Sequence, residues 1–197
     1  MVDSLLMIEV NAYKHRYSAF EMYKIFLLMF KDLSLMIKNK KEKDVDEDFI
    51  ERIMLAVTEV NGCAVCSYAH TKMALESGFS IEEVESFFNG SDTYIKAEES
   101  LGIMFAQHYA DNKGSYTKEH FASLVDYYGE KRSKIILAAT RGMMAGNVIG
   151  LPMSAFSSRF KGKKYANSSL FYEITMMILP IIFIPISGIH SLFLKKT

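Results

Sequence analysis

The chain has 197 residues, a length that suits one domain with a sizeable hydrophobic core. Its 23 basic and 23 acidic residues balance, so no net positive charge draws it toward nucleic acid. Hydrophobic residues make up 50% of the sequence, which excludes a disordered chain. The sequence has only 3 prolines and 11 glycines, fewer chain breakers than turn-rich β architectures use, so composition favours an all-α fold.

The two cysteines and the N-terminus bear on the cellular compartment. The cysteines lie three positions apart, which excludes a disulfide-rich scaffold and leaves a redox pair or part of a metal site. No secretory signal is recognisable, because the first apolar run, Leu5 to Ile8, is short and ends at Glu9. We therefore expect a cytoplasmic protein.

Hydrophobic periodicity predicts helices in the first third of the chain. Apolar side chains recur at three- and four-residue steps between Ala19 and Ile37, the period of one helical face. The charge run from Asn39 to Asp48 is expected to be a solvated linker. A second helix is predicted from Asp48 to Val60, and the pair Asn61-Gly62 ends it because these residues favour positive φ.

The middle of the chain also predicts helices. One is expected to begin at Cys63 and to end at Gly78, a natural glycine for a helix C-terminus. Ser80 to Glu83 forms a capping-box pattern for a short helix that ends at Phe88. Further helices are predicted over Thr93–Tyr109, Lys118–Tyr128 and Glu130–Val148. No segment shows the sustained alternation of a strand.

The C-terminal part differs in composition from the rest. We expect a helical domain over residues 1–165 and an apolar helix or tail over residues 166–197. The basic stretch Phe160 to Asn167 predicts a linker, and Ile174 to Leu194 holds no formally charged residue. That segment is long enough to cross a bilayer, although two prolines interrupt it. Two hypotheses stay open: a helix buried against the domain or in a subunit interface, and a membrane anchor.

Chemically informative residues gather between Glu51 and His70. Cys63 and Cys66 stand at a predicted helix N-terminus, whose positive dipole end stabilises a thiolate. Three-residue spacing in a helix brings their Cα atoms within the range that a disulfide accepts. His70 follows Cys66 by four residues on the same helical face, where an imidazole can accept the thiol proton.

A carboxylate that orients His70 would complete a proton relay, and two acids are candidates. The break at Asn61-Gly62 predicts an antiparallel helix pair, in which residues equidistant from the turn lie level. Glu51 then falls near the height of His70, and Glu59 near that of Cys66. Periodicity does not choose between the two acids.

The spacing of these residues resembles a known signature. The signature is a glutamate, a CxxC pair that begins after eleven intervening residues, and a histidine after three more. It is met by Glu51, Cys63, Cys66 and His70. With these spacings the chain resembles the alkyl hydroperoxidase D-like branch of the carboxymuconolactone decarboxylase family. The flanking sequence from Asp48 to Phe88 extends the resemblance, which continues more weakly through the small-residue stretch of residues 141–147 and does not cover the tail.

The resemblance implies an all-helical bundle that assembles as a homo-oligomer, a trimer or a multiple, without cofactor or metal. It implies a thiol peroxidase acting on a small organic hydroperoxide or on hydrogen peroxide. Cys66 would be the nucleophile, Cys63 would resolve its sulfenic acid and meet the reductant, and His70 with Glu51 would relay protons. The implied reductant is a dithiol protein or a dihydrolipoyl group.

Other functions stay open beside this one. The cysteine pair could switch the assembly of a redox-sensing or membrane-associated oligomeric module. A cofactor-free decarboxylase of the same family would use His70 and a glutamate, but such members typically lack the cysteine pair. Some redox members carry a histidine between the cysteines, where this chain has Ala64 and Val65. A metal site on Cys63, Cys66 and His70 would need a fourth ligand, and no second CxxC is present.

Overall fold

The computed structural model describes residues 11–194, which form eight helices and no strand, so the predicted all-α fold is confirmed. The apolar run Leu5 to Ile8 lies outside the described residues. The helices are α2 (Ala19–Glu42), α3 (Glu47–Asn61), α4 (Ala64–Glu76), α5 (Ile81–Phe88), α6 (Ser100–Asp111), α7 (Lys118–Tyr128), α8 (Glu130–Phe160) and α9 (Leu170–Ser191).

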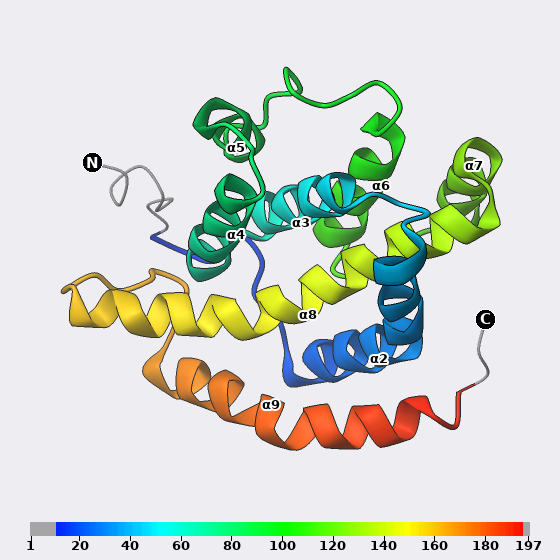
Figure 1. Ribbon diagram of the computed structural model, residues 1–197. Coiled ribbons are helices and arrows are strands. Elements are labelled where there is room, and N and C mark those ends of the chain that lie inside the picture. Colours follow the sequence, from blue (N-terminus) through cyan, green and yellow to red (C-terminus); the bar gives the residue numbers. More distant parts are fainter. Residues whose placement is uncertain (1–10, 195–197) are drawn as a thin grey trace.

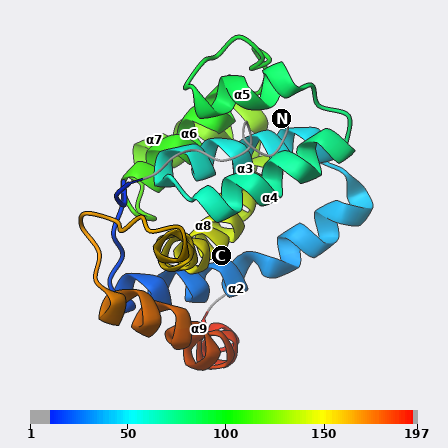
Figure 2. The same cartoon turned by 90° about the vertical axis from the view of Figure 1, so that its left-hand side faces the viewer.

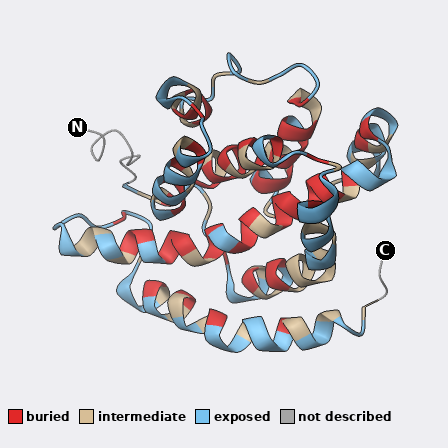
Figure 3. Ribbon diagram, in the orientation of Figure 1, coloured by how far each residue is buried: buried red, intermediate tan, exposed pale blue. Residues whose placement is uncertain are grey.

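Helix α8 is the central element of the molecule. Its 31 residues run between a layer made of α3 to α6 and a second layer made of α2 and α9 (Figures 1 and 2). It packs against α2, α3, α4, α6, α7 and α9. Most of its side chains are buried, as are those on the facing side of α3 (Figure 3). Helix α8 therefore supplies the surface on which the cysteine-bearing helix α4 rests.

The turn between α3 and α4 has the predicted positive φ. Gly62 ends α3 at φ 66°, in the left-handed region that glycine tolerates best. Asn61 is fully buried, and its side chain donates to the carbonyl of Val57 and accepts the hydroxyl of Tyr17 at 2.5 Å. The Asn61 amide also donates to the Met144 sulfur at 3.3 Å, so its hydrogen bonds tie the turn to α8 and to the segment before α2.

The predicted linker of residues 39–48 is shorter than expected. Helix α2 continues to Glu42 and α3 begins at Glu47, so the charged residues on both sides are mostly helical. Asn39 is buried rather than solvated, and its side chain bonds the backbone N–H and carbonyl of Val45. These hydrogen bonds hold the short turn between α2 and α3, which the charge pattern did not reveal.

Two predicted helix boundaries were wrong. Helix α6 begins at Ser100 and not at Thr93. Glu99 just before it is 3% exposed and pairs with the buried Arg52, a tertiary contact that periodicity does not report. Helix α8 continues twelve residues beyond Val148, through Pro152. Packing along its length outweighs the hydrogen bond that an interior proline removes.

The apolar C-terminal segment forms helix α9, which packs against α2 and α8 by one face only. Its one acidic residue, Glu173, is fully buried and accepts two hydrogen bonds from Arg159 at the end of α8. Ser168 adds a third at 2.6 Å. Burial alone would raise the pKa of the Glu173 carboxyl, but these bonds outweigh burial and hold that pKa below its ordinary value.

We predict that Glu173→Gln lowers the free energy of unfolding by about 2 kcal/mol at pH 7, because charge-assisted hydrogen bonds are lost. Since the carboxyl pKa is lower in the folded state, this contribution is complete above about pH 4.3, the ordinary pKa of glutamate. It is lost as pH falls through the folded-state value. Urea unfolding measures the difference in the free energy of unfolding between Glu173→Gln and wild type, which should be smaller below pH 4 than at pH 7. A difference that stays constant between these pH values would contradict this explanation.

Candidate redox site at the start of helix α4

The cysteine pair is built into the N-terminus of α4. Cys63 is the residue that caps the helix, and its sulfur accepts the backbone N–H of Cys66 at 3.3 Å. The Cys63 carbonyl accepts both the backbone N–H and the hydroxyl of Ser67. The two cysteines are joined by a disulfide with their Cα atoms 5.2 Å apart, as their spacing predicted. The first turn of α4 therefore holds the sulfurs at a helix end, where thiolates are stabilised.

A carboxylate from α3 contacts the histidine of α4. Glu51 Oε1 lies 2.8 Å from His70 Nδ1, and both side chains are mostly buried. An ionised carboxylate only accepts hydrogen bonds, so His70 Nδ1 carries a proton and Nε2 is left as the basic nitrogen. Glu59, the other candidate, instead pairs with Lys14 at 2.8 Å. Of the two acids that the sequence left open, the structure brings Glu51 to His70.

Cys66 and His70 open into one cavity of about 530 Å³. Helix α3 contributes Met54 to its wall, and α8 contributes Met143, Ile149 and Met153, among others. These side chains are apolar, so the cavity suits a small organic molecule with one polar reacting group. Cys63 is fully buried, whereas Cys66 is 7% exposed and lines the cavity. The two sulfurs thus differ in access, and Cys66 is the one that a small molecule reaches.

Small residues on α8 form the floor beneath the cysteines. Gly142, Gly146, Gly150 and Ser154 follow one another at four-residue intervals and share a helical face. A Cβ atom at Gly150 would lie 2.6 Å from the Cys63 sulfur and would also overlap the Cys66 sulfur. Ser154 accepts the backbone N–H of Val65 at 3.0 Å, which satisfies a free donor in the first turn of α4.

Sequence reasoning missed Gly150 and Ser154 as parts of the site. The signal that could have found them is the four-residue repeat of small residues, which marks a face that another element can approach closely. Among residues 11–194, no three histidine, cysteine, aspartate or glutamate side chains gather in a way that could hold a metal ion. The fourth ligand that a metal site on this cysteine pair would need is therefore not found in that part of the chain.

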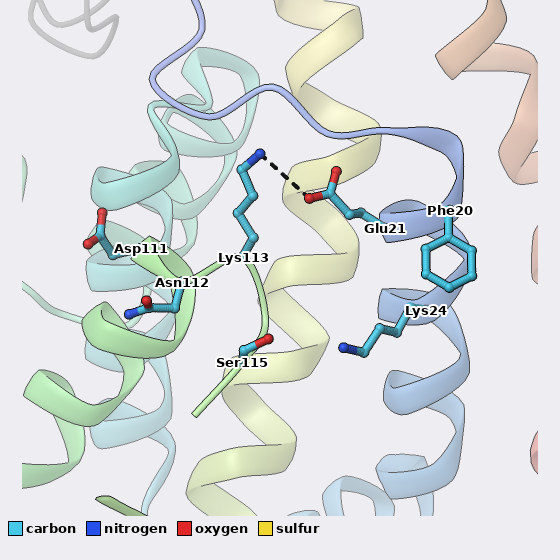
Figure 4. A pocket seen from close by; sticks show the side chains of 7 residues that line it. All are labelled: Phe20, Glu21, Lys24, Asp111, Asn112, Lys113 and Ser115. Carbon is cyan, nitrogen blue, oxygen red and sulfur yellow. Dashed lines mark ion pairs between the residues drawn. The ribbon is translucent and has the colours of Figure 1, made fainter. Parts of the chain in front are cut away.

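A second hollow, of about 380 Å³, lies between the start of α2 and the loop after α6 (Figure 4). Its charged groups include Glu21 on α2 and Lys113, whose Nζ lies 3.5 Å from the Glu21 carboxylate. Phe20 and Lys24 stand on the side formed by α2 (Figure 4). Neither a cysteine nor a histidine lines this hollow, so the candidate site is the cavity at α4.

Comparison with known protein families supports this location. Residues 29–101 match the model of the carboxymuconolactone decarboxylase family. The match covers most of α2, all of α3, α4 and α5, and all four residues that the sequence singled out. Over this range the match supports the resemblance to the wider family without assigning the hydroperoxidase branch, and α8 and α9 lie outside it. No curated protein and no solved structure matched the chain.

We predict opposite effects for alanine at two glycines of α8. Gly150→Ala should lower the free energy of unfolding by about 1–3 kcal/mol, because the new Cβ overlaps the sulfurs. Gly142→Ala, with open space around its Cβ, should raise it by about 0.5–1 kcal/mol through helix propensity. Urea unfolding of the oxidised proteins measures both. Stabilisation in both variants would show that α4 does not rest on Gly150.

Proposed function

We propose that this chain is a thiol peroxidase of the alkyl hydroperoxidase D-like branch, reducing small hydroperoxides through a Cys63–Cys66 disulfide cycle. The observation that carries the proposal is the shared cavity of Cys66 and His70, with His70 held by Glu51. A purely structural disulfide needs neither an open cavity at one sulfur nor an oriented base beside it. A nucleophilic thiol needs both.

The first step oxidises Cys66. His70 accepts the thiol proton, and the Cys66 thiolate attacks the outer oxygen of the hydroperoxide. The S–O bond forms as the O–O bond breaks, which leaves a sulfenic acid on Cys66. The alkoxide leaves as an alcohol after it takes the proton from His70. Glu51 keeps the imidazole oriented through these two transfers and stabilises its protonated form.

The second step closes the disulfide. The Cys63 thiolate attacks the Cys66 sulfur, the S–S bond forms, and the sulfenic oxygen leaves as water with one added proton. An external dithiol then attacks the disulfide and is itself oxidised, which returns both cysteines to thiols. The described disulfide corresponds to the state between these two events.

Burial changes the expected position at which the reductant attacks. The resemblance implies that Cys63 meets the reductant, but Cys63 is fully buried and does not line the cavity. In our proposal the reductant therefore attacks the Cys66 sulfur through the cavity. Cys63 leaves as the thiolate, and the backbone N–H of Cys66 and the positive end of α4 stabilise its charge.

A cofactor-free decarboxylase is the rival within the same family. It would use His70 and Glu51 as an acid–base pair and would assign no role to the cysteines. The geometry favours redox chemistry because Cys66 shares the cavity wall with His70. Replacing Cys66 by serine distinguishes the two, since it abolishes a thiol peroxidase and leaves the cavity open for acid–base chemistry on His70 and Glu51.

We predict that one equivalent of cumene hydroperoxide consumes two thiols in the reduced wild-type protein and none in Cys66→Ser. The serine hydroxyl is a far weaker nucleophile than a thiolate, so the remaining Cys63, buried behind it, stays reduced. Titration with a thiol reagent in denaturant counts the free thiols. Rapid loss of the Cys63 thiol in Cys66→Ser would assign the attack to the wrong cysteine.

We predict that Glu51→Gln and Glu59→Gln differ in the rate at which peroxide drives disulfide formation. Glu51→Gln should slow peroxide-driven disulfide formation by about tenfold or more, because His70 loses the charge that supports its protonated form. Glu59 contacts Lys14 rather than His70, so Glu59→Gln serves as the matched control and should stay within about twofold of wild type. Equal rates in the two variants would remove the relay from the mechanism.

A further inference from the structure

Helix α9 is attached to the rest of the molecule by one face along its length. Near its start, the Tyr172 hydroxyl donates to the carbonyl of Tyr17 at 2.7 Å. Near its end, the Tyr23 hydroxyl lies 2.8 Å from His190 Nδ1. Between these points Phe183 packs edge-on against the ring of Tyr23. Helix α9 thus packs against both α8 and α2, starting below the end of α8 and continuing below the first part of α2 (Figure 1).

The opposite face of α9 is apolar and exposed. A surface helix of a soluble protein normally turns polar residues outward. In α9, every exposed side chain except His190 is apolar. The outward residues include Phe171, Ile174, Ile178, Ile181, Ile182 and Ile189. Figure 3 shows how much of this helix is exposed, in contrast to α8.

A comparison with α8 shows that apolar composition alone does not explain this surface. Both helices are long and apolar enough to cross a membrane. The apolar window of α8 is 78% buried inside the protein, as expected of a core helix, whereas that of α9 is only 22% buried. A contiguous exposed apolar face of this kind marks an interaction site.

Charge indicates what covers this face. Glu173, the one formally charged residue of α9, is buried and paired with Arg159, so the outward face carries no formal charge. The loop before α9 exposes Lys161, Lys163 and Lys164. Two further lysines follow α9 in the sequence. An apolar face next to a basic loop is complementary to a bilayer with anionic headgroups.

A second copy of this chain is a poorer match for the same surface. In a two-fold symmetric pair with parallel α9 helices, the basic loop before one α9 would meet the basic loop before the other. The outward face offers no acidic side chain to compensate, because Glu173 is already buried and paired. Like charges would therefore face each other across the interface.

We infer that the outward face of α9 docks the protein onto an anionic membrane surface, with the helix lying in the plane of the interface. Crossing the bilayer would require α9 to give up its bond to Tyr17, just before α2, and its bond to Tyr23 on α2, and to expose the buried Glu173. Lying in the plane keeps these contacts and buries only the face that is exposed. The inference does not depend on the peroxidase proposal, because no residue of the cysteine site takes part.

The test is sedimentation of the full-length protein with two sets of vesicles, phosphatidylcholine alone and phosphatidylcholine with 30% phosphatidylglycerol. We expect binding to the anionic vesicles that weakens as salt rises. Ile181→Glu should weaken it by about tenfold or more, because it places a charge on the apolar face. The matched control is Met104→Glu on α6, an exposed apolar residue away from α9, which should bind like wild type.

A second variant tests the basic loop before α9 independently. Lys164→Gln should weaken binding to anionic vesicles about fivefold and leave the fold intact, since this side chain is exposed. Absence of binding to either vesicle would overturn the inference. A wild-type dimer that Ile181→Glu dissociates in sedimentation velocity would assign the face to a second copy. Protection of a cysteine placed at residue 197 from an impermeant thiol reagent, on intact vesicles, would show that α9 crosses the bilayer.

Discussion

The close approach of α4 to Gly150 of α8 is the constraint on which the rest of the structure depends. Both sulfurs occupy the space that a side chain at position 150 would fill. Only glycine allows the first turn of α4 to rest there, and Ser154 one turn further along α8 satisfies an amide of that turn. Once α4 is seated, the turn at Gly62 sends it back along α3, and Glu51 meets His70.

This arrangement gives two neighbouring cysteines different environments. Cys63 is buried at the helix end, where backbone N–H groups stabilise a leaving thiolate. Cys66 faces an apolar cavity that it shares with His70. This difference in access supports our proposal that Cys66 is the nucleophile and Cys63 the resolving thiol. In the proposed mechanism, peroxide and reductant therefore reach the same sulfur in turn through one cavity.

The sequence predicted the reactive residues of the site better than the residues of α3 and α8 that position them. The spacing of Cys63, Cys66 and His70 depends only on local helix geometry, so their shared helix could be predicted and was found. The choice between Glu51 and Glu59 depends on how α3 and α4 are rotated about their axes, which periodicity does not fix. The contribution of α8 depends on contacts about ninety residues away in the sequence. The outward apolar face of α9 was likewise undecided, because hydropathy gives the composition of a helix but not which neighbour covers it.

In the proposed mechanism, Cys66 is the sulfur that attacks the hydroperoxide. The most direct measurement treats reduced Cys63→Ser with one equivalent of cumene hydroperoxide in the presence of dimedone, which forms a covalent adduct with sulfenic acids. Peptide mass spectrometry then locates the adduct. We predict an adduct on Cys66, and a much smaller amount of this adduct when Glu51 is also replaced by glutamine. A Cys66 that stays a free thiol under these conditions would contradict the account.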